Sequence, residues 1–213
     1  MLGMARAFWD NGYTVVLFDF RSFAERPTAQ SIGFFEQRDS RAILKEARSR
    51  YPDSKLGVVG ASMGGAMALT TSFGEEGRKY GVGAVASDCA FSDLDGVVAH
   101  FLRQRLGFPS RIAELTMKVC RAFNKSWYGW SLEDVSPLEA VCDPDGPKPP
   151  LLLIHSADDG LVPLSHARKL FDQAQSDKKE LWVVPSIEHL GAYFSANKYE
   201  YTRRLVAFFD GNL

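Results

Sequence analysis

The sequence predicts an α/β fold in which a doubly wound, mostly parallel sheet carries a helical cap insertion. Two observations lead to this fold class. Short apolar runs alternate with segments of helical periodicity over most of the 213 residues, and one stretch of roughly 60 residues interrupts the alternation. Strands that alternate with helices are typical of a parallel sheet with helices on both faces. Ligands of such sheets bind beyond the carboxyl ends of the strands.

Five apolar runs predict the strands. They cover residues 13–18, 56–59, 82–86, 151–155 and 180–184. The run at 13–18 is apolar almost throughout, which predicts a strand buried on both faces. Pro149 and Pro150 directly precede the fourth run and mark its start.

Helical periodicity predicts the elements between these strands. The helices are expected at residues 1–10, 33–51, 163–174 and 198–209, with another from residue 63 to Gly74. Asn11-Gly12 ends the first helix. In the last, Tyr201, Leu205, Phe208 and Phe209 share one face, which predicts that this face is buried.

The stretch that interrupts the alternation lies within residues 91–148 and predicts two more amphipathic helices. Apolar residues share one face of each: Leu94, Val97, Val98 and Phe101 in the first, and Ile112, Leu115, Val119 and Phe123 in the second. We interpret 91–148 as a cap over the carboxyl edge of the sheet, inserted between two core segments, 1–90 and 149–213. Trp127, Tyr128 and Trp130 follow in a turn and could line an apolar substrate pocket. Alternatively, these rings attach the cap to the core.

Composition excludes several classes of function. The net charge is −1, so no basic excess favours a nucleic acid or a membrane surface. No apolar run has the length of a membrane span, and no signal peptide is visible, which predicts a cytoplasmic protein. Cys89, Cys120 and Cys142 have neither metal-site spacing nor a disulfide pattern, so we expect free thiols, no metal and no cofactor.

The strongest motif is Gly60-Ala61-Ser62-Met63-Gly64, a G-x-S-x-G sequence between a predicted strand and a predicted helix. In this context the serine is placed on a tight, strained turn with its hydroxyl exposed. We expect Gly60 and Gly64 to be required because a side chain at either would collide with neighbouring backbone. The Met63 N–H begins the helix and could stabilise an oxyanion. The alternative is an ordinary glycine-rich turn.

A serine nucleophile needs a base and an orienting carboxylate. Of the four histidines, only His189 follows directly after a predicted strand end, so we expect it to be the base. His100 and His166 lie in predicted helices and are expected to be solvated surface residues, and His155 is expected to make a structural hydrogen bond. Asp158 and Asp159, both just beyond a strand end, remain alternatives for the acid on position alone.

The residues around these positions resemble the α/β-hydrolase family, including its bacterial capped esterase and serine aminopeptidase-like members. Relatives carry H-G-x-x-D-x-x-V-P where this chain has HSADDGLVP at 155–163, and this resemblance implies that Asp159 is the acid. Residues 12–21 are similar to the family's G-Y-x-V-x-x-x-D-x-R strand, and Ser136-Pro137 also recurs. The order Ser62, Asp159, His189 is the order of that family.

Two departures from the family pattern matter. Relatives usually have glycine after the arginine at position 21, where this chain has Ser22. They also have about three strands, and an H-G loop that supplies a second oxyanion donor, before the first helix of this chain. The absent third strand lies between the family's counterparts of runs 13–18 and 56–59. We therefore expect a truncated chain, or one that completes its sheet edge by oligomerising or by shifting a strand.

The resemblance and the triad together predict a serine hydrolase that cleaves carboxylic esters or thioesters of a small, largely apolar molecule. The alternatives are a peptidase on the same fold and a non-catalytic module that binds a ligand. The intact triad favours an enzyme, whereas the absent H-G loop favours a binding module.

Overall fold

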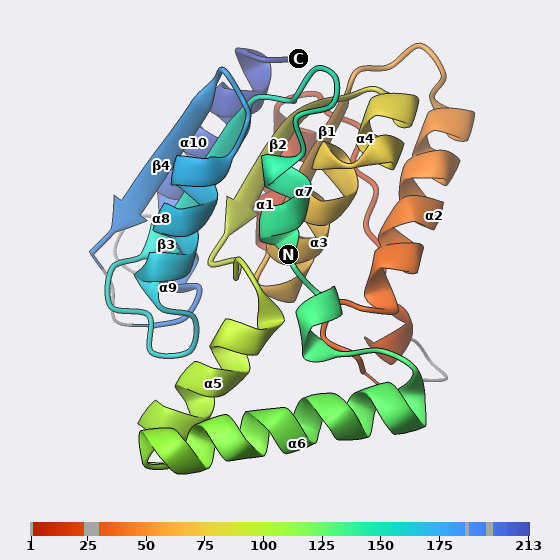
Figure 1. Ribbon diagram of the computed structural model, residues 1–213. Coiled ribbons are helices and arrows are strands. Elements are labelled where there is room, and N and C mark those ends of the chain that lie inside the picture. Colours follow the sequence, from red (N-terminus) through yellow and green to blue (C-terminus); the bar gives the residue numbers. More distant parts are fainter. Residues whose placement is uncertain (1, 24–29, 186–187, 195–197) are drawn as a thin grey trace.

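A computed structural model describes residues 2–23, 30–185, 188–194 and 198–213. The described residues contain one four-stranded sheet, in the order β1-β2-β3-β4 (Figure 1). The strands are β1 Leu56–Ala61, β2 Val82–Asp88, β3 Leu151–Ser156 and β4 Lys179–Val184. Each neighbouring pair is parallel. The carboxyl ends of all four strands therefore lie at one edge of the sheet, which confirms the predicted fold class.

Helices cover both faces of this sheet (Figure 1). One face carries α2 Glu36–Arg50, α3 Met63–Phe73, α4 Glu75–Tyr80, α7 Pro137–Cys142 and α8 Leu164–Gln173. The other carries α1 Leu2–Asp10, the short α9 Gly191–Phe194 and α10 Lys198–Asp210. Each layer has its own apolar core, because alternate residues of β2 and β3 point to opposite faces. The predicted helices are confirmed, although α2 begins three residues later than expected.

The predicted strand at residues 13–18 is wrong. These residues have no regular secondary structure, and Val16, Leu17 and Phe18 are exposed. A strand is stable only where a neighbour accepts and donates its backbone hydrogen bonds. Among the described residues β1 pairs with β2 alone, and no segment pairs with its other edge. The apolar run is therefore a loop, which ends in the 3-10 helix η1 Arg21–Phe23.

The segment expected to form a cap contains α5 Leu94–Gln104 and α6 Ser110–Tyr128, followed by the 3-10 helix η2 Leu132–Asp134. Figure 1 shows α6 lying across one end of the molecule, beyond α5. The helix positions match the prediction, but the buried face of α6 does not. Ala113 and Met117 are buried, whereas the apolar residues that predicted the helix are exposed. The last helix of the insertion, α7, packs on α3 and α8 and so belongs to the core layer.

Trp130 attaches the cap to the core. Its ring is 7% exposed and stacks on Phe34 at 5.2 Å between ring centroids. Trp127, at the end of α6, is 75% exposed and contacts Phe123 within the same helix. The two tryptophans therefore differ in role although only three positions separate them.

Replacing each tryptophan separately tests this difference. Trp130→Ala removes a buried ring and should lower the free energy of unfolding by about 3–5 kcal/mol. Trp127→Ala removes an exposed ring and should lower it by less than about 1 kcal/mol. Urea unfolding of the two variants beside the wild type measures both values. Equal losses would show that Trp130 does not anchor the cap.

Candidate active site

Ser62 lies on the turn between β1 and α3 in a strained conformation. Its φ is +53° and its ψ is −123°, a region that non-glycine residues rarely adopt. The Ser62 N–H donates a hydrogen bond to the Asp88 carbonyl at the end of β2, at 2.8 Å. Its carbonyl accepts from the Ala66 N–H at 3.0 Å. These two bonds hold the backbone while the side chain points away from the strand.

Two glycines permit this turn, Gly60 and Gly65, and the sequence predicted only Gly60. A Cβ at Gly60 would lie 2.1 Å from the Gly64 carbonyl oxygen, so no side chain fits there. A Cβ at Gly64 would meet only the Phe20 ring, at 3.9 Å. The expectation that Gly64 must be glycine is therefore wrong. Gly65 is the second tight position, because a Cβ there would lie 2.6 Å from Ser87 Oγ.

His189 connects Ser62 to Asp159. The Nε2 atom of His189 lies 2.8 Å from Ser62 Oγ, and Nδ1 lies 2.7 Å from Asp159 Oδ2. Because a carboxylate only accepts, Nδ1 carries the proton and Nε2 accepts from the serine hydroxyl. The structure thus brings together the three residues that the sequence predicted, from the ends of β1, β3 and β4.

Asp159 is held as a carboxylate. Burial by itself would raise its pKa, but hydrogen bonds from His189 and from the Val162 and Leu161 N–H groups outweigh it and lower the pKa. Both backbone bonds are 2.9 Å long and end on Oδ1. Asp158 is exposed. Of the two candidate acids, Asp159 is therefore the one that bonds His189.

Two other histidines, His155 and His166, are buried and make hydrogen bonds away from Ser62. His155 is buried, and its Nε2 lies 2.8 Å from the Val162 carbonyl, as expected. Burial lowers the pKa of His155 and keeps the ring neutral. The expectation that His166 is a solvated surface residue is wrong. His166 is buried against Ser92, whose N–H donates to Nδ1 at 3.2 Å.

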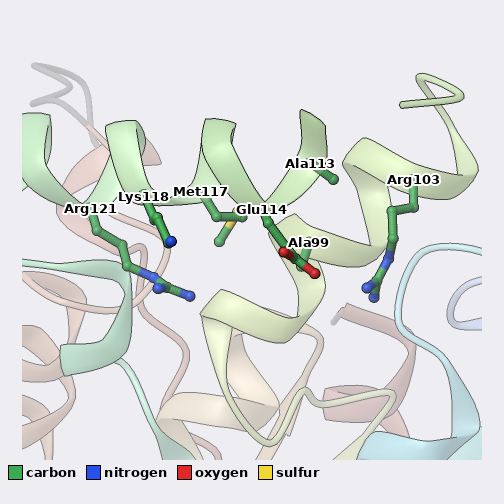
Figure 2. A pocket seen from close by; sticks show the side chains of 7 residues that line it. All are labelled: Ala99, Arg103, Ala113, Glu114, Met117, Lys118 and Arg121. Atoms are coloured by element: carbon green, nitrogen blue, oxygen red, sulfur yellow. The ribbon is translucent and has the colours of Figure 1, made fainter. Parts of the chain in front are cut away.

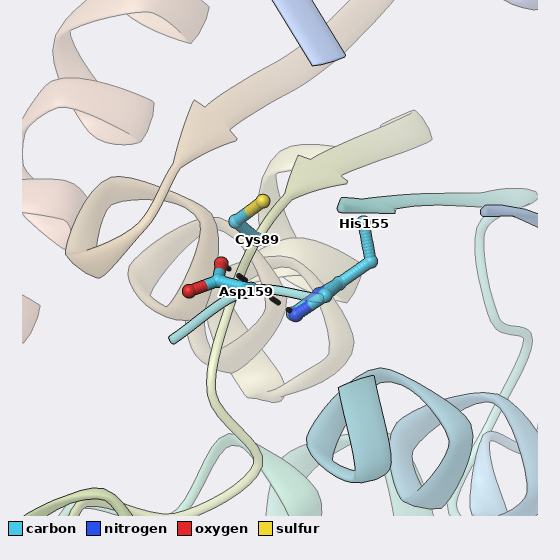
Figure 3. A group of neighbouring side chains, drawn as sticks. All are labelled: Cys89, His155 and Asp159. Atoms are coloured by element: carbon cyan, nitrogen blue, oxygen red, sulfur yellow. Dashed lines mark ion pairs between the residues drawn. The ribbon is translucent and has the colours of Figure 1, made fainter. Parts of the chain in front are cut away.

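Cys89, His155 and Asp159 form a buried group whose ligand atoms lie within 4.8 Å of one another (Figure 3). These residue types could ligate a metal, but Asp159 bonds His189 and His155 Nε2 bonds the Val162 carbonyl. His155 Nδ1 has no partner among the described residues. Burial raises the pKa of the Cys89 thiol, which keeps it protonated. All three cysteines are free thiols.

Asp88 is a site neighbour that the sequence did not single out. It ends β2, is 1% exposed and accepts a hydrogen bond from the Tyr201 hydroxyl at 2.9 Å. Its other oxygen has no partner in the described part of the chain. Burial raises the pKa of Asp88 to about 6. The sequence signal that could have identified Asp88 is an acidic residue at the end of an otherwise apolar strand.

The remaining predicted residues occupy mixed positions. Met63 is the first residue of α3, so its N–H is one of the first-turn groups that have no acceptor within the helix. Trp127 and Tyr128 are the last two residues of α6 rather than part of a turn, and both are exposed. Their role in substrate binding stays a prediction. Trp130 is buried among core residues, which favours the alternative that its ring attaches this segment to the core, and its role in substrate binding also stays a prediction.

Comparison with known proteins identifies the family. Residues 36–213 match the prolyl oligopeptidase family. The chain belongs to this family. The protein YqkD of Bacillus subtilis (strain 168), which is uncharacterized, is 27% identical over 205 residues, or 95% of this chain and 64% of YqkD. The uncharacterized YfhR of Escherichia coli (strain K12) is 25% identical over 201 residues, or 93% of this chain and 61% of YfhR. The chain thus spans less than two thirds of the length of these relatives.

Solved structures share the fold. The esterase Pf2001 of Pyrococcus furiosus superimposes with a TM-score of 0.73 at 22% identity, over 100% of this chain and 76% of that one. The esterase domain of a Rhodothermus marinus protein superimposes with a TM-score of 0.62 at 24% identity, over 97% of this chain and 76% of that one. At these identities the likeness shows the fold alone. The chain is a member of the α/β-hydrolase superfamily. No described helix is both long enough and apolar enough to cross a bilayer.

The two glycines of the turn give a matched test. Gly60→Ala places a methyl group against backbone atoms that cannot move, so the free energy of unfolding should fall by about 1–3 kcal/mol or more. Gly64→Ala meets no close atom and should be neutral or stabilise α3 by up to about 1 kcal/mol. Urea unfolding measures both. A Gly64→Ala variant as unstable as Gly60→Ala would contradict the geometry.

The raised pKa of Asp88 predicts a pH dependence of stability. The pKa rises from 3.8 to about 6 on folding, so the protonated form favours the folded state. This contribution is complete below pH 4 and is lost as the pH rises through 6, by about 3 kcal/mol. Asp88→Asn keeps an acceptor for Tyr201 but cannot ionise. Its stability relative to the wild type should therefore increase between pH 4 and pH 7.

Unfolding in urea at both pH values measures this difference. Asp53→Asn, at an exposed position, is the matched control and should show the same stability relative to the wild type at each pH. An Asp88→Asn variant that behaves like Asp53→Asn would show that Asp88 does not titrate in this range.

Proposed function

We propose that the chain is a serine hydrolase in which Ser62 attacks a carbonyl carbon. His189 accepts the serine proton and returns it to the leaving group, and Asp159 orients His189. The Met63 N–H, at the positive end of α3, stabilises the oxyanion. The observation that carries the proposal is the continuous hydrogen-bonded path from Ser62 Oγ through His189 to Asp159. Water, deprotonated by His189, then attacks the acyl-enzyme carbonyl, and His189 returns that proton to Ser62 Oγ as the acid leaves.

We infer that the substrate is a small carboxylic ester or thioester with an apolar acyl group. Two solved structures of the same fold are titled esterases, which supports an ester. Membership of the prolyl oligopeptidase family supports the second candidate, a peptide bond. The same triad can perform either acyl transfer. Three free thiols support a reducing compartment, in line with the cytoplasmic location predicted above.

Members of the family that the chain resembles carry a second oxyanion donor on an H-G loop, and the sequence predicts no such loop within residues 1–213. Loss of one such donor costs about 100- to 1,000-fold in rate. A chain with an activated serine but one donor would acylate slowly. The competing proposal is a binding module in which the triad geometry persists without turnover.

A fluorophosphonate probe separates these proposals. The folded chain should be labelled, Ser62→Ala should not, and His189→Ala should react about 1,000-fold more slowly or worse because the base is missing. Ser54→Ala, at an exposed serine, is the matched control and should be labelled like the wild type. Rates on nitrophenyl esters and on peptide nitroanilides then distinguish an esterase from a peptidase.

Each outcome has a distinct meaning. Labelling that is absent in Ser62→Ala, slow in His189→Ala and unchanged in Ser54→Ala supports a hydrolase, and faster ester cleavage supports the ester assignment. Labelling that survives in Ser62→Ala would show that another group reacts. A folded wild type that is not labelled would overturn the catalytic proposal and leave the binding module.

A further inference from the structure

An apolar ridge runs along the outward face of α6. Its members recur every three or four residues and are between 49% and 75% exposed: Ile112, Leu115, Val119, Phe123 and Trp127. They span about 22 Å of helix. Isolated exposed apolar residues are common, but a continuous exposed row of this length marks an interaction surface. We refer to these five residues as the α6 ridge.

A row of cations flanks the α6 ridge. Arg111, Lys118 and Lys125 are spaced by seven residues, so they lie almost on one line along the helix. All three are exposed. Among the residues that the structure describes, none of the three forms an ion pair, unlike Arg121, which is bound to Asp95 at 2.6 Å. We refer to these three residues as the α6 cation row.

The positive flank continues onto α5 across a hollow of about 240 Å³. Figure 2 shows Lys118 and Arg121 at one end of this hollow and Arg103 at the other, with Glu114 between them. Its floor includes the apolar side chains of Ala99, Ala113 and Met117. Arg103 also forms no ion pair with a described residue. The flank therefore carries several uncompensated positive charges and one carboxylate.

A second copy of the chain is a poor occupant for this face. If two α6 helices packed antiparallel about a two-fold axis, each flank would meet the same flank of its partner. Lys118 would then face Lys118, and Arg111 would face Lys125, which is repulsive. In a parallel pair the cation row would face Thr116, Cys120 and Trp127, which carry no negative charge. Neither arrangement neutralises the row.

We propose that α6 binds flat on the surface of a bilayer that contains anionic lipids. The α6 ridge enters the boundary between headgroups and acyl chains, and the α6 cation row contacts lipid phosphates and carboxylates. A helix with an apolar face, a cationic flank and an aromatic residue at one end has the composition of interfacial helices. Trp127 is the aromatic residue, of a type enriched at the membrane interface. The proposal is independent of the triad.

Vesicle co-sedimentation of the full 213-residue chain tests the proposal. The vesicles are phosphatidylcholine alone, and phosphatidylcholine with phosphatidylserine in a two-to-one ratio. We expect binding to the mixed vesicles, weak binding to phosphatidylcholine alone, and a loss of binding as salt is raised, because salt screens the cations.

Two variants separate the charge from the apolar contact. Arg111→Gln with Lys118→Gln and Lys125→Gln removes the cation row and should lower the partition coefficient about 100-fold. Leu115→Gln with Val119→Gln interrupts the ridge and should lower it about tenfold or more. The matched control replaces three exposed lysines elsewhere, Lys45, Lys55 and Lys178, with glutamine. It has the same net charge as the first variant and should bind like the wild type.

Fluorophosphonate labelling and urea unfolding of each variant show whether the fold and the reactive serine are unchanged, so a failure here is distinct from a failure of the triad. Binding by the control variant and not by the other two supports the proposal. No binding by the folded wild type overturns it. Equal losses in the control and cation-row variants also overturn it. Self-association that the ridge variant abolishes, without vesicle binding, would instead assign the face to a second copy.

Discussion

The close approach of β1 and α3 is the constraint on which the site depends. The Gly64 carbonyl lies where a Cβ of Gly60 would be, and Gly65 packs against Ser87 of β2. Only this contact lets the chain turn from strand to helix within two residues. Ser62 in this short turn has a positive φ of 53°, and α3 begins at the next residue. The strained serine is therefore directly followed by the positive end of a helix.

The parallel sheet then assembles the rest of the site. Because β1, β2, β3 and β4 lie side by side and run parallel, their carboxyl ends meet at one edge. Residues that are 127 positions apart, Ser62 and His189, therefore come within hydrogen-bond distance. Burial at this edge disfavours the charged form of a carboxyl group. Asp159 offsets the cost of burial with three hydrogen bonds, whereas Asp88, one of whose oxygens has no partner among the described residues, does so through a raised pKa.

Sequence patterns predicted four of the strands and the three residues that the structure joins by hydrogen bonds, because local periodicity and motif order carry that information. Three features required coordinates. The run at 13–18 is as apolar as a central strand, yet strand formation depends on a neighbour that local sequence does not reveal. Periodicity also located α6 without showing which of its faces points outward. The net charge of −1 is a sum over 213 residues, so it does not reveal the α6 cation row.

The cap is connected to the core only between β2 and β3, and none of the three triad residues lies within it. The three hydrogen-bonded residues and the helices α5 and α6 are therefore encoded in separate blocks of sequence. Changes in α5 and α6 can alter what the chain recognises without altering the distances among Ser62, His189 and Asp159. Selection can therefore act on the two blocks independently. Relatives with the same arrangement of these three residues can then bind different molecules.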